Sequence, residues 1–396
     1  MKKSGVLTLG LMLQGGAGWL GGALYVENLC RSLLTLLPDS PTPFRLVLFG
    51  NTAQLDGVKY LAGAACRLVN LEHAPPIGFR QRQFYRLQRF VFGYKTPWFD
   101  RMMQDEGVDF LYPYCAQDAK PKDFRSAAWM PDFQHAVIPE MFGVAELQER
   151  DAGFRHMLTY AESIVLSSNS ARTHCQNYYP EALRKVKVLE FPSLLEPSVG
   201  ADSPNAVATF NLPEKFFLVS NQFWRHKNHG IVFEALHLLK AQGLDIVVVC
   251  TGHTYDYRKP QYFDELLGEI HKSNLAEQVR ILGVVPRALQ LQLMQAAQAI
   301  IQPSLFEGWN TTVEDARAMG CPIILSDIGV HLEQAPPQCA YFESTSAASL
   351  ALEMRRNWEH EKTARGSVNF QALRTAQRQR VNDFARKFLS IAGAEA

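Results

Sequence analysis

Short apolar runs alternate with stretches of helical periodicity along the whole chain, and this alternation limits the possible folds more than any other feature. Strands that alternate with helices favour parallel βα units. In the first half the expected strands are Val6–Leu11, Arg45–Phe49, Asp109–Tyr112, Ala127–Met130, Ser163–Ser167 and Val186–Leu189. In the second half they are Phe216–Ser220, Asp245–Cys250, Val279–Leu282, Ala299–Gln302, Pro322–Ser326 and Ala340–Phe342. The sequence therefore predicts an α/β protein.

A proline-rich stretch divides the chain into two parts of similar size. Residues 191–213 hold four prolines and show no sustained period, which is typical of a linker between domains. A length of 396 residues also favours two domains at about 150 residues each. We expect domains over 1–195 and 210–374, joined by a linker over 196–209.

Composition excludes several classes of protein. Lys plus Arg (40) nearly equals Asp plus Glu (39), so binding of nucleic acid through an overall positive charge is not expected. The seven cysteines include no CxxC pair, which argues against a disulfide framework or a zinc site and favours a reducing cytosol. No apolar run reaches the ~18 residues of a membrane span. The first apolar run has some features of a leader peptide, but it enters a glycine loop without a clean cleavage site, so we expect a buried strand.

A glycine loop follows the first expected strand. Residues 16–21 fit the GxGxxG pattern of dinucleotide-binding folds, which would make the chain a dinucleotide-dependent oxidoreductase. That function also needs an acid at the end of the second strand, where residues 48–51 offer none. Gly21 and Gly22 at the helix start could instead bring backbone N–H groups close to a phosphate or sugar. A glycine hinge without a ligand is the alternative.

Charged residues follow two strands of the second half. Arg225 and Lys227 lie between a strand and a helix, where two cations and a helix dipole suit a diphosphate, although a solvated basic turn is the alternative. Glu307 follows a later strand and is expected in a loop at the cleft. Glu314 and Asp315 lie on the next helix about 100° apart, so only one of them can reach the same site. A capped surface helix is the alternative for this segment.

Residues 303–327 resemble the nucleotide-sugar signature of retaining glycosyltransferase family 4, which has the GT-B fold. The shared pattern is a Glu-Gly-aromatic turn, a second acid eight positions later, and a small-residue helix that ends Gly-Cys-Pro. Three further loops of the same family have counterparts here, in the same order along the chain. The diglycine loop resembles residues 19–22, the acceptor-side loop resembles residues 131–140, and the basic donor loop resembles residues 221–229. The resemblance implies two Rossmann-like domains facing a cleft, an N-terminal one for the acceptor and a C-terminal one for the nucleotide sugar. It also implies that the C-terminal helix, residues 375–396, packs back on the N-terminal domain.

The resemblance assigns roles to individual residues. Glu307 contacts hydroxyls of the donor sugar, and Lys227 binds the diphosphate. Asp315 holds the ribose, with Glu314 as the alternative. Arg225 takes the place of a family arginine whose position is Gln222 here, and His135 lies near the reacting sugar, with core packing as its alternative. Further expected donor contacts come from Gly21, Gly22, Asn228, Gly308, Trp309, Asn310 and Thr311.

The implied activity is transfer of a sugar, with retention, from a nucleotide diphosphate sugar to a hydroxyl acceptor in cell-surface polysaccharide or glycolipid synthesis. No metal or other cofactor is expected, and a non-catalytic nucleotide-sugar-binding protein is the alternative. Residues 79–95 combine basic and apolar faces, which is typical of a helix on an anionic membrane that meets a lipid-linked acceptor. Packing of that helix on the sheet is the alternative. We expect a cytoplasmic protein, with the inner face of the membrane as a further location.

Overall fold

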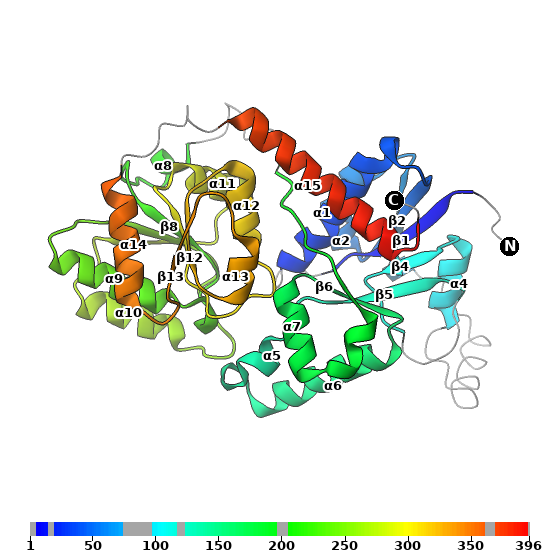
Figure 1. Ribbon diagram of the computed structural model, residues 1–396, viewed down its shortest axis with the longest axis horizontal. Coiled ribbons are helices and arrows are strands. Elements are labelled where there is room, and N and C mark those ends of the chain that lie inside the picture. The colour runs from blue at the N-terminus through cyan, green and yellow to red at the C-terminus, as the bar shows by residue number, and fades with distance from the viewer. Residues whose placement is uncertain are drawn as a thin grey trace.

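The computed structural model describes residues 5–14, 20–73, 97–116, 123–195, 205–360 and 369–394. These residues form two α/β domains side by side, and a long C-terminal helix crosses from one to the other (Figure 1). Each domain is built on its own parallel sheet with helices packed against it. The predicted fold class, two Rossmann-like domains, is confirmed.

The N-terminal domain has a seven-stranded sheet in the order β3-β2-β1-β4-β5-β6-β7, with every neighbouring pair parallel. Its strands are β1 (Leu7–Met12), β2 (Phe44–Gly50), β3 (Cys66–Asn70), β4 (Phe110–Tyr112), β5 (Arg125–Met130), β6 (Ser163–Leu166) and β7 (Val186–Val188). Its helices are α1 (Leu20–Leu36), α2 (Thr52–Val58), α4 (Pro97–Asp105), α5 (Gln134–Val137), α6 (Val144–Tyr160) and α7 (Asn169–Tyr178). Short 3₁₀ turns lie at Leu37–Asp39, Lys59–Leu61, Leu71–His73, Pro139–Met141 and Pro180–Lys185. The edge strand β3 was not expected, because only Cys66 in it is fully buried and its apolar signal is weak.

The C-terminal domain has a six-stranded parallel sheet in the order β10-β9-β8-β11-β12-β13. Its strands are β8 (Phe217–Ser220), β9 (Val248–Thr251), β10 (Val279–Gly283), β11 (Ile300–Gln302), β12 (Ile323–Ser326) and β13 (Cys339–Phe342). Its helices are α8 (Ala206–Thr209), a 3₁₀ turn η6 (Arg225–Lys227), α9 (His229–Ala241), α10 (Tyr262–Lys272), α11 (Arg287–Ala296), α12 (Thr311–Met319), α13 (Gly329–Gln334) and α14 (Ala347–Glu359). The linker expected over 196–209 extends too far toward the C-terminus, because its last residues form α8. This helix packs against α11 and buries Ala206 in the C-terminal core.

The last helix, α15 (Phe370–Ile391), spans both domains (Figure 1). Phe384 and Phe388, one helical turn apart, are buried in the N-terminal core beside α1. The ring of Phe388 lies 5.9 Å from that of Phe110 in an edge-to-face arrangement. Earlier on the same helix, Arg380 pairs with Glu314 of the C-terminal domain. The helix therefore contacts the N-terminal domain through buried apolar side chains and the C-terminal domain through an ion pair.

The loops at the carboxyl ends of the two sheets meet each other. Ser168, in the segment after β6, donates a hydrogen bond to the carbonyl oxygen of Gly308 at 2.9 Å, and Gly308 follows β11. A Cβ atom on Gly308 would collide with the carbonyl oxygen of Pro131 and lie 2.7 Å from Cβ of Asp132, in the segment after β5. Ligand sites of open α/β sheets lie outside these strand ends. The fold thus places the predicted loops at the contact between the domains.

Candidate active site

The turn after β11 holds the carboxylate of Glu307 in a fixed position. Asn310 caps α12, because its Oδ1 accepts from the backbone N–H groups of Thr312 at 3.0 Å and Val313 at 3.2 Å. The Nδ2 of Asn310 donates to Glu307 Oε1 at 3.1 Å, and the hydroxyl of Ser304 donates to the same oxygen at 2.6 Å. The cap of one helix therefore also orients the acid that the sequence singled out.

Lys227 and Glu307 come together in the structure. The Nζ of Lys227 lies 2.6 Å from Oε1 of Glu307, and the two side chains are 18% and 8% exposed. The loops that carry them are also joined through their backbones, because the N–H of Leu305 donates to the carbonyl oxygen of His226 at 2.8 Å. The 3₁₀ turn η6 ends at Asn228, whose left-handed backbone (φ 56°) turns the chain into α9. An ammonium has three N–H donors, so this pairing leaves Lys227 able to bind an anion as well.

A buried histidine supports the same turn from behind. Nε2 of His331 lies 3.3 Å from Nδ2 of Asn310, and its Nδ1 lies 3.0 Å from the hydroxyl of Ser326. Burial lowers the pKa of His331 to about 4, so the ring is neutral at pH 7. A neutral ring can accept from Asn310 without opposing the charge of Lys227.

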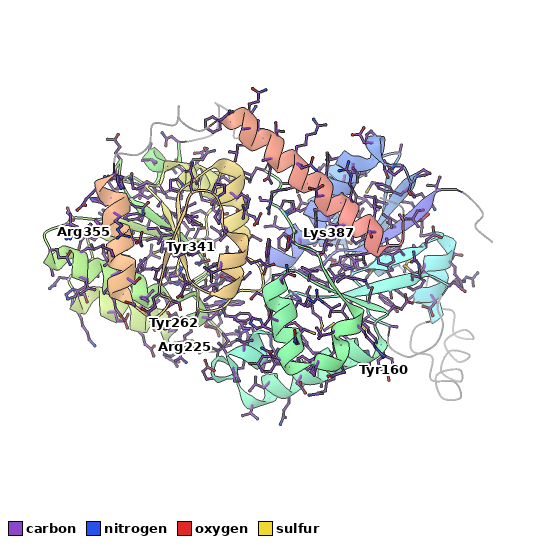
Figure 2. All side chains as sticks on the ribbon, in the orientation of Figure 1. Tyr160, Arg225, Tyr262, Tyr341, Arg355 and Lys387 are labelled. Carbon is purple, nitrogen blue, oxygen red and sulfur yellow. The ribbon has the colours of Figure 1, made fainter. Side chains whose placement is uncertain are left out.

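Arg225 does not join this cluster. Its side chain is exposed and lies beside Tyr262 at the start of α10, as Figure 2 shows. Its backbone N–H donates to Oδ2 of Asp256 at 3.1 Å. The geometry therefore gives no support to the expectation that Arg225 replaces the family arginine at Gln222.

A different arginine, which the sequence analysis did not select, joins the two domains at this point. The guanidinium of Arg258 is 7% exposed and lies 4.1 Å from the ring centroid of Phe142, a distance typical of a cation–π contact. It also donates to Oε1 of Gln134 at 3.2 Å and lies 3.6 Å from Glu146. Hydrogen bonds and ion pairs with Tyr257, Arg150 and Arg258 hold the pKa of Glu146 below its usual value despite burial.

Glu314 and Asp315 have different partners. Glu314 is fully buried, with Arg380 at 2.7 Å and the side-chain amide of Gln334 at 3.1 Å. Asp315 accepts from Arg287 at 2.6 Å and from the hydroxyl of Ser193 at 2.5 Å. Both acids line a cavity of about 300 Å³ between α1, α11 and α12. Thr311, the first residue of α12, lines the same cavity.

Trp309 and Gly308 lie against the N-terminal domain. The indole N–H of Trp309 donates to the carbonyl oxygen of Phe191 at 2.9 Å, and its ring packs against the N-terminal core. Gly308 closely approaches Pro131 and Asp132, as described above. These two residues of the expected donor loop therefore also connect the domains, a role that the sequence did not indicate.

His135 is a buried residue of α5, only 4% exposed. Its Nε2 lies 3.1 Å from the hydroxyl of Tyr179, and its ring meets that of Phe154 edge to face at 4.5 Å. Burial and the nearby charge of Arg150 lower its pKa. A second cavity, of about 490 Å³, lies next to this helix and is lined by Val137 of α5 and by Glu307, among others.

The remaining expected contacts are placed as follows. Gly21 and Gly22 lie in the first turn of α1, and Asn228 donates its side-chain amide to the carbonyl oxygen of Ser344 at 3.2 Å.

Trp19 and the segment 79–95 lie outside the described residues, so the membrane-contact hypothesis is not addressed by the structure. Within the described ranges, no group of three or more His, Cys, Asp or Glu side chains could hold a metal ion. No helix in those ranges is long and apolar enough to cross a bilayer.

Sequence reasoning missed contacts that form only when the two domains meet. The carboxylate of Glu333 on α13 accepts from the backbone N–H groups of Asn169 at 2.7 Å and Ser170 at 2.8 Å, at the start of α7. A carboxylate at a helix N-terminus is stabilised by the helix dipole. Glu333 lies in the stretch that continues the family resemblance, but nothing local indicates its partner.

The fold and the paired loops define a two-domain protein of the GT-B class. Residues 205–366 match the family model described as glycosyl transferases group 1, so the C-terminal domain is similar to that family. The predicted resemblance to a nucleotide-sugar glycosyltransferase is confirmed at that level, and family 4 in particular stays a prediction.

Individual relatives agree with this assignment. The chain is 29% identical over 106 residues to the protein named glycosyltransferase EpsF of Bacillus subtilis, a match that spans 27% of this chain and 26% of that relative. Anabaena HepE, solved in complex with UDP and glucose, superposes with a TM-score of 0.64 at 16% identity and covers 97% of this chain and 100% of its own. WaaG, a glycosyltransferase involved in lipopolysaccharide biosynthesis, has a TM-score of 0.54 at 13% identity and covers 96% and 95%. At these identities the solved structures show a shared fold.

Proposed function

We propose that this chain is a retaining glycosyltransferase of family 4 that transfers a sugar from a nucleoside diphosphate sugar to a hydroxyl acceptor. The observation that carries the proposal is the 2.6 Å pair of Lys227 and Glu307 beside the domain contact. The pair supplies a cation for a diphosphate and a carboxylate for sugar hydroxyls, and the two groups are close enough to contact adjacent parts of one nucleotide sugar. Uridine diphosphate is the proposed carrier, because HepE shares the fold and was solved with UDP and glucose.

Such a reaction mainly requires that the negative charge on the departing diphosphate be stabilised. Lys227 would stabilise it from η6, and the N-termini of α9 and of α1, with Gly21 and Gly22, would add backbone N–H donors. Asp315 would accept hydrogen bonds from the ribose in the cavity of about 300 Å³. Catalysis without a metal stays a prediction.

Retention is proposed from the resemblance of residues 303–327 to the family 4 signature, and the way Glu307 is held favours a reaction without a covalent intermediate. Three donors, Lys227, Ser304 and Asn310, converge on its Oε1, and an acceptor so stabilised is a weak nucleophile. In the proposed step the bond between the anomeric carbon and the phosphate oxygen breaks. A bond to the acceptor oxygen forms on the same face, and the acceptor proton passes to the leaving phosphate oxygen. Closure of the domains would exclude water from this step.

The acceptor is proposed to be a precursor of cell-surface polysaccharide or glycolipid. WaaG, which shares the fold, is named for lipopolysaccharide biosynthesis. The N-terminal domain would hold the acceptor, with the segment 79–95 reaching a lipid-linked acceptor at the inner face of the membrane. A soluble acceptor is the alternative.

Release of nucleoside diphosphate from UDP-, GDP- and ADP-glucose, with and without an acceptor panel, tests the proposal. We expect release from at least one donor and an unchanged anomeric configuration in the product, read by NMR. Glu307→Gln should remove transfer, whereas Glu265→Gln, in an exposed ion pair with Lys259, should not. Inversion would refute retention, and binding of a donor without any release would favour the non-catalytic alternative.

A further inference from the structure

The cavity of about 490 Å³ lies between the two domains and reaches Glu307. Its N-terminal side includes residues of α7, and its C-terminal side is formed by the turn after β11 and the start of α13. These two helices pack against each other at the domain boundary (Figure 1). Of the residues that the structure describes, none lines both this cavity and the cavity of about 300 Å³ that holds Asp315 and Thr311. The two cavities therefore offer separate places for different parts of the substrates.

The position of Glu307 indicates which substrate the α7 end of this cavity receives. The proposed donor extends from a ribose at Asp315 to a sugar at Glu307. The acceptor hydroxyl must meet the anomeric carbon of that sugar, so the acceptor has to lie in contact with it. The cavity continues from Glu307 to Thr173 and His174 of α7, and its volume is typical of small-molecule sites. An acceptor bound against α7 can therefore reach the donor sugar.

The N-terminus of α7 is already occupied by a carboxylate of the chain itself. The Oε1 of Glu333 accepts from the backbone N–H of Asn169 at 2.7 Å, and its Oε2 accepts from the backbone N–H of Ser170 at 2.8 Å. The side-chain amide of Asn169 also donates to Oε1 at 3.0 Å. Backbone N–H groups at the start of a helix are where a phosphate of a ligand readily binds. Because Glu333 takes these donors, they are not offered to an anionic acceptor.

The charges around the cavity also disfavour an anion. The described residues that line it include Glu307 and Glu333 but neither lysine nor arginine. Burial lowers the pKa of His174, although the charge of Asp132 opposes this shift, so the imidazole is neutral at pH 7. A phosphate or carboxylate on the acceptor would face like charges without a cation beside it, and like-charge contacts cost binding energy.

The rest of the lining suits a neutral sugar. The Oε2 of Glu333 accepts from a single backbone N–H, which leaves a lone pair for a sugar hydroxyl. The ring of His174 stacks on that of Phe306 at 5.7 Å, and Leu305 and Val330 add apolar surface. A pyranose ring has hydroxyl groups at its edge and C–H groups on its faces. Such a ring can therefore use both the polar and the apolar groups of this cavity.

We propose that this cavity binds the acceptor as a neutral sugar residue, and that Glu333 excludes phosphorylated and acidic acceptors by occupying the N-terminus of α7. The inference rests on the proposed function for the role of the bound sugar as acceptor. The preference of the cavity for a neutral sugar does not depend on that function.

Titration of the full chain, followed by ¹H–¹⁵N NMR, tests the binding directly. The probes are the methyl hexosides of glucose, galactose and mannose, and the 6-phosphates of the same hexoses. We expect at least one methyl hexoside to shift the backbone amide signals of Thr173 and His174. Its Kd should be at least about tenfold lower than that of the corresponding 6-phosphate, because the phosphate meets the acids of the cavity.

Two variants should weaken this preference. Glu333→Ala vacates the N-terminus of α7, so inorganic phosphate should shift the amide signals of Asn169 and Ser170 in this variant but not in the wild type. Thr173→Lys adds a cation at an exposed position of the lining and keeps the contact of Glu333 intact. Each variant should lower the ratio of the two Kd values at least about tenfold.

Matched controls separate these effects from general changes in charge or stability. Glu72→Ala removes a carboxylate that accepts from the backbone N–H of Thr52 at 3.1 Å, at the start of α2. Thr375→Lys changes an exposed threonine of α15 whose hydroxyl donates to the carbonyl oxygen four residues earlier, as that of Thr173 does. Both controls should keep the wild-type ratio.

Equal binding of a methyl hexoside and its 6-phosphate to the wild type would overturn the inference. So would the absence of any shift at Thr173 and His174 with all three methyl hexosides, or a ratio that neither Glu333→Ala nor Thr173→Lys changes. Release of UDP from a donor is measured separately. If no donor is turned over while a methyl hexoside still binds at these residues, the proposed function is wrong and the preference of the cavity for a neutral sugar stands.

Discussion

Glu314 and Asp315 are adjacent in the sequence but pair with arginines of different helices, Arg380 of α15 at 2.7 Å and Arg287 of α11 at 2.6 Å. Neighbouring helical residues point about 100° apart, so each acid faces its own partner. Glu314 connects α12 to the helix that joins the domains. Asp315 pairs with an arginine that is 37% exposed, and both line the cavity of about 300 Å³.

The first prediction separates these two acids. Asp315→Asn should weaken UDP binding about tenfold, because a charge-assisted acceptor for the ribose is lost. Glu314→Gln should leave UDP binding nearly unchanged but lower the free energy of unfolding by about 3 kcal/mol, because Arg380 and Arg317 lose their buried partner. Calorimetric titration and chemical denaturation measure the two effects. The reverse pattern would assign the ribose to Glu314.

A second prediction concerns the contact between the domains at Gly308. Gly308→Ala should lower the free energy of unfolding by about 1–3 kcal/mol, because the new methyl group collides with the carbonyl oxygen of Pro131. Small-angle scattering should show a larger radius of gyration as the domains move apart. The matched control is Gly268→Ala in α10, where a Cβ meets nothing within 4 Å and should stabilise the helix by about 0.5–1 kcal/mol. Equal melting temperatures for Gly308→Ala and the wild type would contradict the close contact.

Buried histidines predict how stability depends on pH. Burial lowers the pKa of His229 to about 3, and neither ring nitrogen has a hydrogen-bond partner among the described residues. The unfolded chain therefore binds a proton below pH ~6.5 that the folded chain refuses, so stability is present above that pH and is lost as the pH falls. At pH 4.5 the loss from this residue is about 2–3 kcal/mol.

His229→Phe should flatten that dependence. The ring of His229 stacks on Phe223 at 4.1 Å, so a phenyl ring keeps the packing and removes two unpaired nitrogens. Urea denaturation from pH 7 to pH 4.5 should show a smaller loss of stability in the variant. Parallel curves for the wild type and the variant would show that His229 does not titrate as proposed.

The short-range features of the site could be predicted from the sequence, whereas its long-range pairs could not. Glu307 and Asn310 lie within one turn, and their spacing after a strand already indicated a polar loop at a strand end. The strands could also be predicted, because their apolar runs are short-range features of the sequence. The prediction missed β3, where most side chains are half exposed and the apolar signal is weak. The partner of His135 is 44 positions away at Tyr179, and only the packing of α5, α6 and α7 brings them together. Such pairs leave no local period in the sequence.

The central claim is that Lys227 binds the diphosphate of a nucleotide sugar. Calorimetric titration of UDP and of uridine into the wild type and Lys227→Ala tests it most directly, because the two ligands differ only in the diphosphate. We expect Lys227→Ala to lose about 2 kcal/mol of binding free energy for UDP and none for uridine. The control Lys259→Ala, from an ion pair with Glu265, should bind both ligands as the wild type does. Unchanged affinity of Lys227→Ala for UDP would contradict the claim.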